Sequence, residues 1–594
     1  MATKQAPGQR VARQRDGHEP RSSVAKGGRR SRKQTTGQPP AKVGSRLAGR
    51  SIRGVAALSE SIDVRRRLRR LARQIERGRH NVRHMNSVEA AIGDCLDDAA
   101  TAVTARERWL LCEAATWGLA WMARTRRAGG SAGGILERLV KSARAAEADV
   151  SAGDTLPARF ILTLARLFRD IEACRCLEAD AAKALAAEIG RLVSGAGTVS
   201  VRGSAAVVER VARWATCRGL ALATGQAAWD APTEASFAKA VEVALRLLGR
   251  QGRILVGPGR MPAAFSEALI AAAVDATGAR ARRTARLVRS TTGSEKRRRL
   301  LPRDLHDAAA AVAILRSGWG CDAVRLLLEY RDSVPRLEIA VGDRLLVEGP
   351  WQWQVLKDGS PLTAEGPWSL SCWESDRKAT FLEIVAPLAG GLQIDRQIVL
   401  LPRDRVVLLA DAVTQRSGRS ESANGHAHPA PRAAGGITVE SVVPLAASLE
   451  GDVAEETREI LVYDTKPRLL ALPLGLPEWK TAGRGRFTAE AEGLVLSQTA
   501  SGGRCYAPVW IDFDAKRQGK PLTWRQLTVA DTRRNLPPHQ ASGFRVQEGL
   551  EQWLVYRTLD APRNRTLLGC NVSCEFMLGR IGRTGVVDRL IEIQ

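Results

Sequence analysis

The chain has 594 residues, and 44% of them are hydrophobic, which is enough for a large core in more than one domain and excludes a wholly disordered chain. Lys and Arg number 90 against 63 Asp and Glu, and the resulting net charge of +27 predicts attraction to polyanions. The chain contains no long uncharged apolar run and starts without the apolar segment of a secretory signal. We therefore expect no membrane span and a cytoplasmic protein.

The first segment, residues 1–54, is a basic tail. It holds fourteen Lys and Arg against Asp16 and Glu19, a net charge of +12. It is rich in Gly, Ser, Gln and Pro and has no aromatic residue, so we expect it to be disordered. A tail of this kind predicts non-specific binding of nucleic acid through phosphate contacts.

Amphipathic helices are predicted from Ser59 to Ala276. In the first of them, Val64, Leu68, Leu71 and Ile75 form an apolar stripe whose back is rich in Arg, either a polyanion-binding face or a solvated one. The others are expected at 88–104, 108–124, 135–148, 157–171, 178–193, 205–223, 235–248 and 262–276. Together they predict an α/α-toroid-like domain over residues 55–303 that ends in a basic hinge, residues 278–303. The Gly257-x-Gly259 pair within this domain is interpreted as a turn between helices.

Residues 304–594 are predicted to form a large antiparallel β-sandwich, which makes the whole chain a multidomain α+β protein. Strands are expected at 311–315, 337–341, 344–348, 381–386, 394–401, 406–412, 460–463, 510–513 and 553–556. The His426-x-His428 pair lies in a predicted loop without a third ligand, and the ten Cys lack zinc-ligand spacing. No metal and no cofactor is therefore expected.

Glu329–Trp351 is predicted to form two strands around a tight turn, and the first of these strands begins among charges. Leu337, Ile339 and Val341 should face the core, while the opposite face carries Arg336 and Glu338. That second face is either solvated or the floor of a site.

Three stretches of the sequence resemble the heparinase II/III-like family. They are "AILRSGWG" from residue 313, "LEIAVGDRLLVEG" from residue 337 and "IDRQIVLLPRDRVVLLADAV" from residue 394, after a helical first half. The resemblance implies an α/α-toroid joined to an antiparallel β-sandwich. It also implies an acidic polysaccharide as partner, cleaved by β-elimination.

The sequence departs from that family where its chemistry is expected. The family's His-x-Asp pair would fall at Arg331 and Ser333, so the expected imidazole is absent. In addition, residues 85–305 contain no His and no Tyr. The interpretation is a degenerate or rebuilt catalytic site, whose candidate residues are Tyr330, Glu338 and Arg331, with Tyr330 or Glu338 moving the proton.

Candidate substrate-binding residues come from a stretch rich in tryptophan. Arg316 or Arg331 is expected to neutralise the substrate carboxylate. Trp319, Trp351 and Trp368 form a saccharide platform or else belong to the core. The alternative to catalysis is a non-catalytic protein that binds glycans or polyanions and carries a basic tail that contacts nucleic acid.

Overall fold

The computed structural model describes residues 44–59, 61–77, 81–123, 131–151, 155–249, 255–256, 259–260, 263–290, 299–416, 436–480, 485–532 and 534–594. They belong to one compact unit, residues 42–594. Residues 1–43 of the predicted tail lie outside the described residues, as does the predicted loop with His426 and His428. None of the helices in the described part has the length and apolar character needed to cross a membrane.

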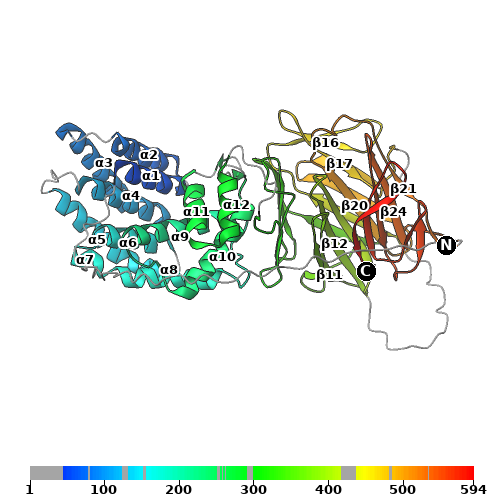
Figure 1. Cartoon of the computed structure of the whole chain (residues 1–594), viewed down its shortest axis with the longest axis horizontal. Helices are drawn as coiled ribbons and strands as arrows, with labels where there is room; N and C mark the ends of the chain where they lie inside the picture. Colours follow the sequence, from blue (N-terminus) through cyan, green and yellow to red (C-terminus); the bar gives the residue numbers. More distant parts are fainter. Residues whose placement is uncertain are drawn as a thin grey trace, which may run out of the picture. The chain divides into compact units, whose positions relative to one another are not determined.

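The first half of the chain is helical, as predicted (Figure 1). Its helices are α1 (Ser45–Leu58), α2 (Ile62–Glu76), α3 (Val82–Thr101), α4 (Ala105–Ala123), α5 (Ser131–Ser151), α6 (Thr155–Leu167), α7 (Glu172–Arg175), α8 (Glu178–Leu192), α9 (Ser204–Ala223), α10 (Ala231–Leu247), α11 (Ala263–Ala276) and α12 (Ala279–Arg289). A two-stranded hairpin, β1 (Leu255–Val256) with β2 (Gly259–Arg260), provides the predicted turn between α10 and α11.

Local signals explain where these helices begin. Ser61 caps α2 by accepting from Val64 N at 3.3 Å, and Asp230 caps α10 by accepting from Thr233 N at 2.9 Å. The predicted stripe of α2 is buried at Leu68, Leu71 and Ile75.

Two segments that we expected to be irregular are helical instead. Helix α1 covers residues 45–58, so the prediction of disorder is wrong from residue 45 to residue 54. Ala48, Ile52 and Val55 form a fully buried stripe along α1, a pattern that the density of Arg had hidden. Likewise α12 occupies much of the predicted hinge, and its Ala281 and Ala285 are fully buried.

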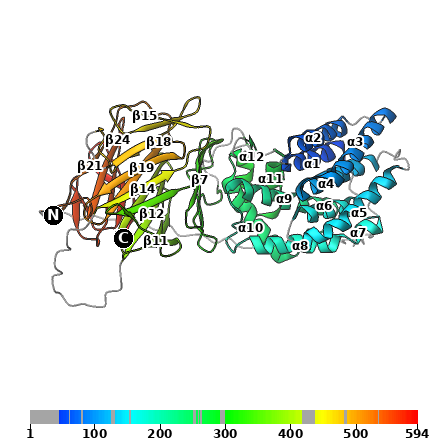
Figure 2. The same ribbon diagram turned by 180° about the vertical axis from the view of Figure 1, so that it is seen from behind.

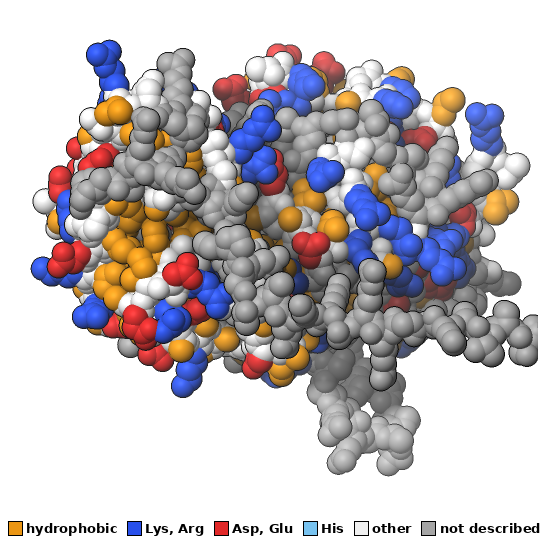
Figure 3. Space-filling view, turned by 60° about the vertical axis from the view of Figure 1, so that its left-hand side comes forward, with side chains coloured by type: hydrophobic (Ala, Val, Ile, Leu, Met, Phe, Trp, Pro, Cys, Tyr) orange, Lys and Arg blue, Asp and Glu red, His pale blue; other side chains and the backbone are white. Residues whose placement is uncertain are grey.

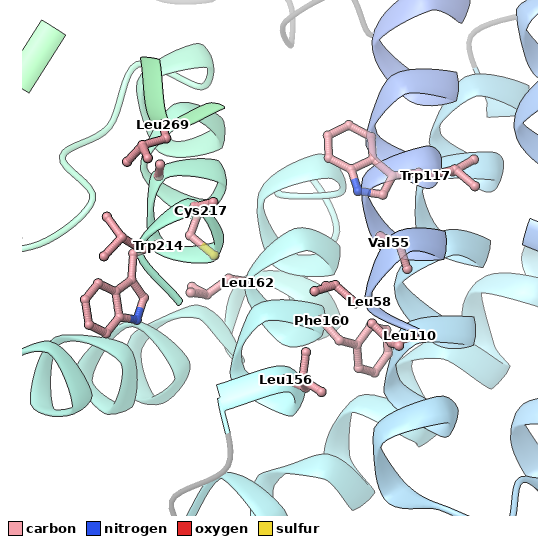
Figure 4. Close-up of a cluster of buried hydrophobic side chains, with 14 of the residues drawn as sticks. Val55, Leu58, Leu110, Trp117, Leu156, Phe160, Leu162, Trp214, Cys217 and Leu269 are labelled. Carbon is pink, nitrogen blue, oxygen red and sulfur yellow. The ribbon is translucent and has the colours of Figure 1, made fainter. Parts of the chain in front are cut away.

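The helices surround one hydrophobic core. Trp214, Phe160 and Leu162 lie within it, together with Leu110 of α4 and Val55 of α1 (Figure 4). Burying large aromatic side chains contributes about 1.5–3 kcal/mol each, which is what holds helices of such different length together.

The second half consists of antiparallel sheets, again as predicted (Figure 2). The sheet nearest in sequence to the helices has the order β3 (Leu305–Asp307), β4 (Val312–Arg316), β5 (Val324–Glu329), β6 (Arg336–Val341), β7 (Arg344–Pro350). We call it the junction sheet. Residues Gly342 and Asp343 make the tight turn between β6 and β7, where Gly342 has φ +61°.

An eight-stranded sheet follows, in the order β10 (Ser369–Ser375), β11 (Thr380–Leu388), β12 (Leu392–Leu401), β13 (Val406–Gln415), β20 (Cys505–Asp512), β17 (Pro467–Pro473), β16 (Ile460–Tyr463), β15 (Glu450–Val453). A five-stranded sheet has the order β18 (Gly485–Glu490), β19 (Gly493–Ala500), β14 (Ile437–Val443), β8 (Gln352–Lys357), β9 (Ser360–Pro361).

The last two sheets come mainly from the end of the chain. One has the order β21 (Leu522–Leu527), β24 (Ala541–Glu548), β25 (Glu551–Thr558), β28 (Phe576–Ile581), β29 (Val587–Ile593). The other has the order β23 (Arg534–Leu536), β22 (Val529–Asp531), β26 (Arg565–Leu567), β27 (Cys570–Val572).

The junction sheet is buried on both faces. Ile314 and Leu327 belong to the core of the helices, whereas Leu315, Leu326 and Leu328 belong to the core between the sheets. The junction sheet is therefore a layer between the helical part and the rest of the β part.

Candidate functional site

The face of the junction sheet toward the helices carries its charged residues. The strand register places Arg316, Arg325, Glu329 and Glu338 on this face, together with Arg336, Glu348 and Asp307. The predicted polar face of β6 is thus partly covered, with Glu338 buried and the Arg336 side chain 33% exposed. It lies against the ends of helices α9 and α10.

Two glutamates hold the first turn of α9. Glu329 accepts from Gly203 N at 3.1 Å, and Glu338 accepts from Ser204 N at 3.1 and 3.2 Å through its two carboxylate oxygens. Gly203 has φ +83°, and a side chain there would place its Cβ 2.9 Å from Glu338 Oε1, so glycine permits this approach. Negative charge at a helix N-terminus is stabilised by its free N–H groups and by the helix dipole.

Two arginines hold the end of α10. Arg316 donates from Nη1 to Arg246 O at 2.6 Å and to Leu248 O at 2.9 Å. Arg325 donates from Nη1 to Leu247 O at 3.2 Å. These cations occupy the negative end of a helix, so the junction sheet supplies the charge that each helix end favours.

Asp307 makes a third contact to the helical part. Ser194 Oγ donates to it at 2.5 Å, and Thr198 Oγ1 also donates to it. These hydroxyl contacts keep the pKa of Asp307 below its ordinary value although burial opposes them.

Burial changes the pKa values of two carboxylates on this face. It raises the pKa of Glu329, and the neighbouring Glu338 adds to the rise while Gly203 N opposes it. It also raises the pKa of Glu348, again with a contribution from Glu338. An acidic side chain with a raised pKa can exchange protons, but the Glu329 carboxylate is held by the start of α9.

The three residues that the sequence offered as catalytic candidates lie in three different places. Glu338 is part of the α9 contact, Arg331 is exposed in the loop between β5 and β6, and Tyr330 is buried in the core between the sheets. Arg331 and Ser333, where the family's pair would fall, lie in this loop and not in a strand.

The predicted saccharide platform is a set of buried side chains. Trp319, Trp351 and Trp368 are only 3%, 1% and 6% exposed. Arg396 lies 3.9 Å from the ring centre of Trp351, whose Nε1 donates to Ser441 Oγ at 3.0 Å. Arg316, the predicted carboxylate ligand, is 1% exposed and lies 4.2 Å from the ring centre of Trp319. The platform and the role of Arg316 are corrected accordingly, because these side chains stabilise the fold.

Sequence reasoning missed His306. The residue is on β3, and its Nε2 lies 2.7 Å from Tyr330 Oη. Its ring is parallel to that of Tyr330 and stacks on Trp373 of β10 with 5.3 Å between ring centres. The available signal was its position, since it is the first His after the long interval that lacks His and Tyr.

The His306–Tyr330 pair is suited to proton transfer. Burial lowers the pKa of His306 and keeps the imidazole neutral near pH 7, although Asp307 opposes this. Burial and Asp307 raise the pKa of Tyr330 to about 12, so the phenol keeps its proton. A neutral acceptor beside a protonated donor is the arrangement that general acid–base chemistry uses.

The described residues contain no group of His, Cys, Asp and Glu side chains that could hold a metal ion. A scan against protein-family models finds no match, and a search of curated proteins finds none.

Solved structures do show a likeness. The chain is similar to heparan sulfate lyase HepC from Pedobacter heparinus, with a TM-score of 0.51 and 11% identity over 88% of this chain and 90% of that one. A structure of heparinase III gives a TM-score of 0.53 and 10% identity over 83% and 82% of the two chains. Another heparinase III gives 0.52 and 8% over 86% and 90%. At these identities the likeness shows the fold, a helical half followed by antiparallel sheets, and that predicted fold is confirmed.

Proposed function

We propose that this chain binds an acidic polysaccharide at the edge where the β5–β6 loop meets the start of α9. The ion pair between Arg202 and Asp332, 2.7 Å from Nη2 to Oδ2, supports this most directly. It brings the exposed Arg202, which precedes α9, next to the loop that carries the exposed Arg331. Two guanidinium groups from distant parts of the sequence therefore share one edge.

Arginine suits this role because its planar donors match carboxylate and sulfate oxygens. The carboxylate oxygens of Glu329 and Glu338 accept hydrogen bonds from the start of α9, so they are engaged there and not at this edge. The HepC structure is titled a heparan sulfate lyase, and heparan sulfate is an acidic polysaccharide of the proposed class.

On the face drawn in Figure 3, positive charge is mixed with negative charge. In the view of Figure 3, Lys and Arg side chains are spread over the molecule with Asp and Glu side chains among them. On α2, Arg66 and Arg67 are paired with Asp63 and Asp98. Arg202 is also paired, with Asp332, so pairing alone does not separate the two places. We choose the edge with Arg202 and Arg331 because its two exposed guanidinium groups come from distant parts of the sequence.

Calorimetric titration with heparan sulfate, alginate and pectate tests this proposal. We expect at least one of them to bind more weakly as salt rises, and Arg202→Ala and Arg331→Ala each to lower the affinity several-fold. Arg583→Ala is the matched control, because it removes an equal charge from an exposed position elsewhere. Equal affinities for all three variants would show that this edge is not the contact.

A second candidate function, β-elimination, is favoured by the hydrogen bond of 2.7 Å between His306 and Tyr330. In this reaction His306 Nδ1 removes the proton α to the uronate carboxylate, the bond to the leaving oxygen breaks, and Tyr330 Oη gives its proton to that oxygen. The Nε2–H of the imidazolium then returns a proton to Tyr330 Oη through the hydrogen bond. Formation of unsaturated uronate, followed by its near-ultraviolet absorbance, measures this activity. Tyr330→Phe and His306→Gln should each abolish it, and absence of product from all three polysaccharides would exclude it for them.

A further inference from the structure

The β part contains a pocket that the proposed function does not use. Its volume is about 240 Å³. Strands β19, β20, β21 and β24 and the loop after β17 contribute its walls, through Gly475, Leu476, Pro477, Gln498, Thr499, Ala500, Ser501, Cys505, Tyr506, Gln526, Pro538, His539, Ser542 and Phe544. Pockets for drug-sized ligands have roughly 300–1,000 Å³, so this one fits a smaller molecule, about one sugar ring.

Among the residues that the structure describes, the pocket walls carry no Lys, Arg, Asp or Glu. Burial and the neighbouring Arg504 lower the pKa of His539, which keeps its imidazole neutral near pH 7. Burial raises the pKa of Cys505 to about 12 and raises that of Tyr506 as well. In a chain with a net charge of +27, this lining is uncharged and selects against ions.

The walls combine hydroxyl, amide and imidazole groups with apolar surface. Ser542 and His539 supply polar groups, and Leu476, Pro477 and Phe544 supply the apolar part. A sugar ring has the complementary composition, with hydroxyl groups at its rim and C–H groups on its faces. A purely apolar ligand would leave the polar groups without partners.

Gln498 points to a hydrogen-bond donor on the ligand. Its Nε2 donates to Tyr506 O at 2.7 Å, which fixes the orientation of the amide because a carbonyl can only accept. Its Oε1 has no hydrogen-bond partner within the described part of the chain, and the residue is only 8% exposed. Gly475 lies against this oxygen, and a Cβ there would come within 2.1 Å of it. A buried acceptor of this kind is destabilising unless a donor reaches it.

The same loop carries an exposed aromatic ring. Trp479 follows Leu476 and Pro477 closely in sequence and is 55% exposed, the highest value for a tryptophan in the described residues. Exposed indole rings are surfaces on which the C–H faces of sugars pack.

We propose that this pocket binds one ring of a neutral sugar, with a ligand hydroxyl donating to Gln498 Oε1 and Trp479 extending the apolar contact outside the pocket. The occupant is a free monosaccharide or a neutral unit within a longer chain. The site is independent of Arg202 and Arg331, so it can fail while the binding of acidic polysaccharide holds, or the reverse.

Saturation-transfer NMR on the full chain tests the proposal, with glucose, galactose, xylose and N-acetylglucosamine at up to about 10 mM and glucuronate as the charged counterpart. We expect at least one neutral sugar to bind and glucuronate to bind more weakly. Gly475→Ala, which displaces the Gln498 amide, and Gln498→Leu, which removes it, should each weaken binding about tenfold. Gly190→Ala is the control, because a Cβ at Gly190 meets open space.

Melting temperatures identify a variant that fails to fold. In that case Trp479→Ala, which changes an exposed side chain, is tested in place of that variant and should weaken binding. The proposal is overturned if none of the neutral sugars binds, or if Gly475→Ala and Gln498→Leu bind as tightly as the unchanged chain. Equal binding of glucuronate would overturn the selection for uncharged ligands.

Discussion

Glu338 shows at the scale of a residue how position decides what a carboxylate does. From the sequence it is a candidate for proton transfer, because it alternates with core residues on β6. In the structure both of its oxygens accept from Ser204 N, and the residue is buried. The sequence could predict that Glu338 faces away from Ile339, but not that a helix begins there, since α9 is distant in the sequence.

Replacing Glu338 should reduce stability. Glu338→Gln keeps an oxygen acceptor but loses the negative charge at the start of α9, so we expect the free energy of unfolding to fall by about 1 kcal/mol. Glu338→Ala leaves Ser204 N without this partner and should lower it by about 2 kcal/mol. Denaturant unfolding measures both, with the exposed Glu492→Gln as control. If Glu338→Ala were as stable as the unchanged chain, the contact would not hold α9.

The pH dependence of the proposed β-elimination follows from His306 and Tyr330. Because the pKa of His306 is lowered, the imidazole becomes neutral and able to accept a proton already below the ordinary value of about 6.5. Tyr330 keeps its proton until pH approaches its pKa of about 12. Initial rates should therefore rise with pH through the His306 pKa and then stay level to high pH. A rate that increased only above pH 8 would assign the base to another group.

At the scale of the element, two buried faces hid one strand but not others, since β12 and β13 were predicted from their long apolar runs and β5 was missed. Strand β5, "VRLLLE", has no alternation because Leu327 packs on the helices while Leu326 and Leu328 pack on the β core. Strand β16 was predicted within its bounds, whereas β14, which alternates between buried and partly exposed residues, was missed. Helix α1 was missed because its buried stripe consists mainly of small residues among Arg and Gly.

Helix α10 depends on Arg316 at its end. Arg316→Ala removes donors from the buried carbonyl groups of Arg246 and Leu248, so we expect a loss of about 3 kcal/mol in the free energy of unfolding. Arg316→Lys should recover only part of this, because an ammonium group cannot reproduce the planar arrangement of donors. Denaturant unfolding of the two variants tests the prediction, and full stability of Arg316→Ala would contradict it.

At the scale of the whole molecule, part of the positive charge holds layers together. Arg316 and Arg325 join the junction sheet to the helices, and Arg557 of β25 reaches Glu383 of β11 at 3.1 Å and Asp395 of β12 at 3.4 Å. All three arginines are buried. The net charge of +27 predicts attraction to polyanions but cannot show which arginines remain available, since that depends on tertiary contacts.

The buried carboxylates beside Arg557 should make stability depend on pH. Burial and the neighbouring Glu383 raise the pKa of Asp395, so the folded chain holds a proton that the unfolded chain releases near pH 4. The free energy of unfolding should then decrease as pH rises from about 4 through the raised pKa. Asp395→Asn should flatten this slope, whereas Asp170→Asn at an exposed position should leave it unchanged. An unaltered slope in Asp395→Asn would contradict the assignment.

The charged face of the junction sheet binds helix ends, and we propose that the edge beside it binds an acidic polysaccharide. The most direct measurement follows binding and unsaturated uronate together in one titration with heparan sulfate, for the unchanged chain, Glu338→Gln and Arg331→Ala. We predict that Glu338→Gln keeps the affinity and the amount of product of the unchanged chain, and that Arg331→Ala binds several-fold more weakly. Product formation that Glu338→Gln abolishes, with binding intact, would contradict the claim and make Glu338 a catalytic residue.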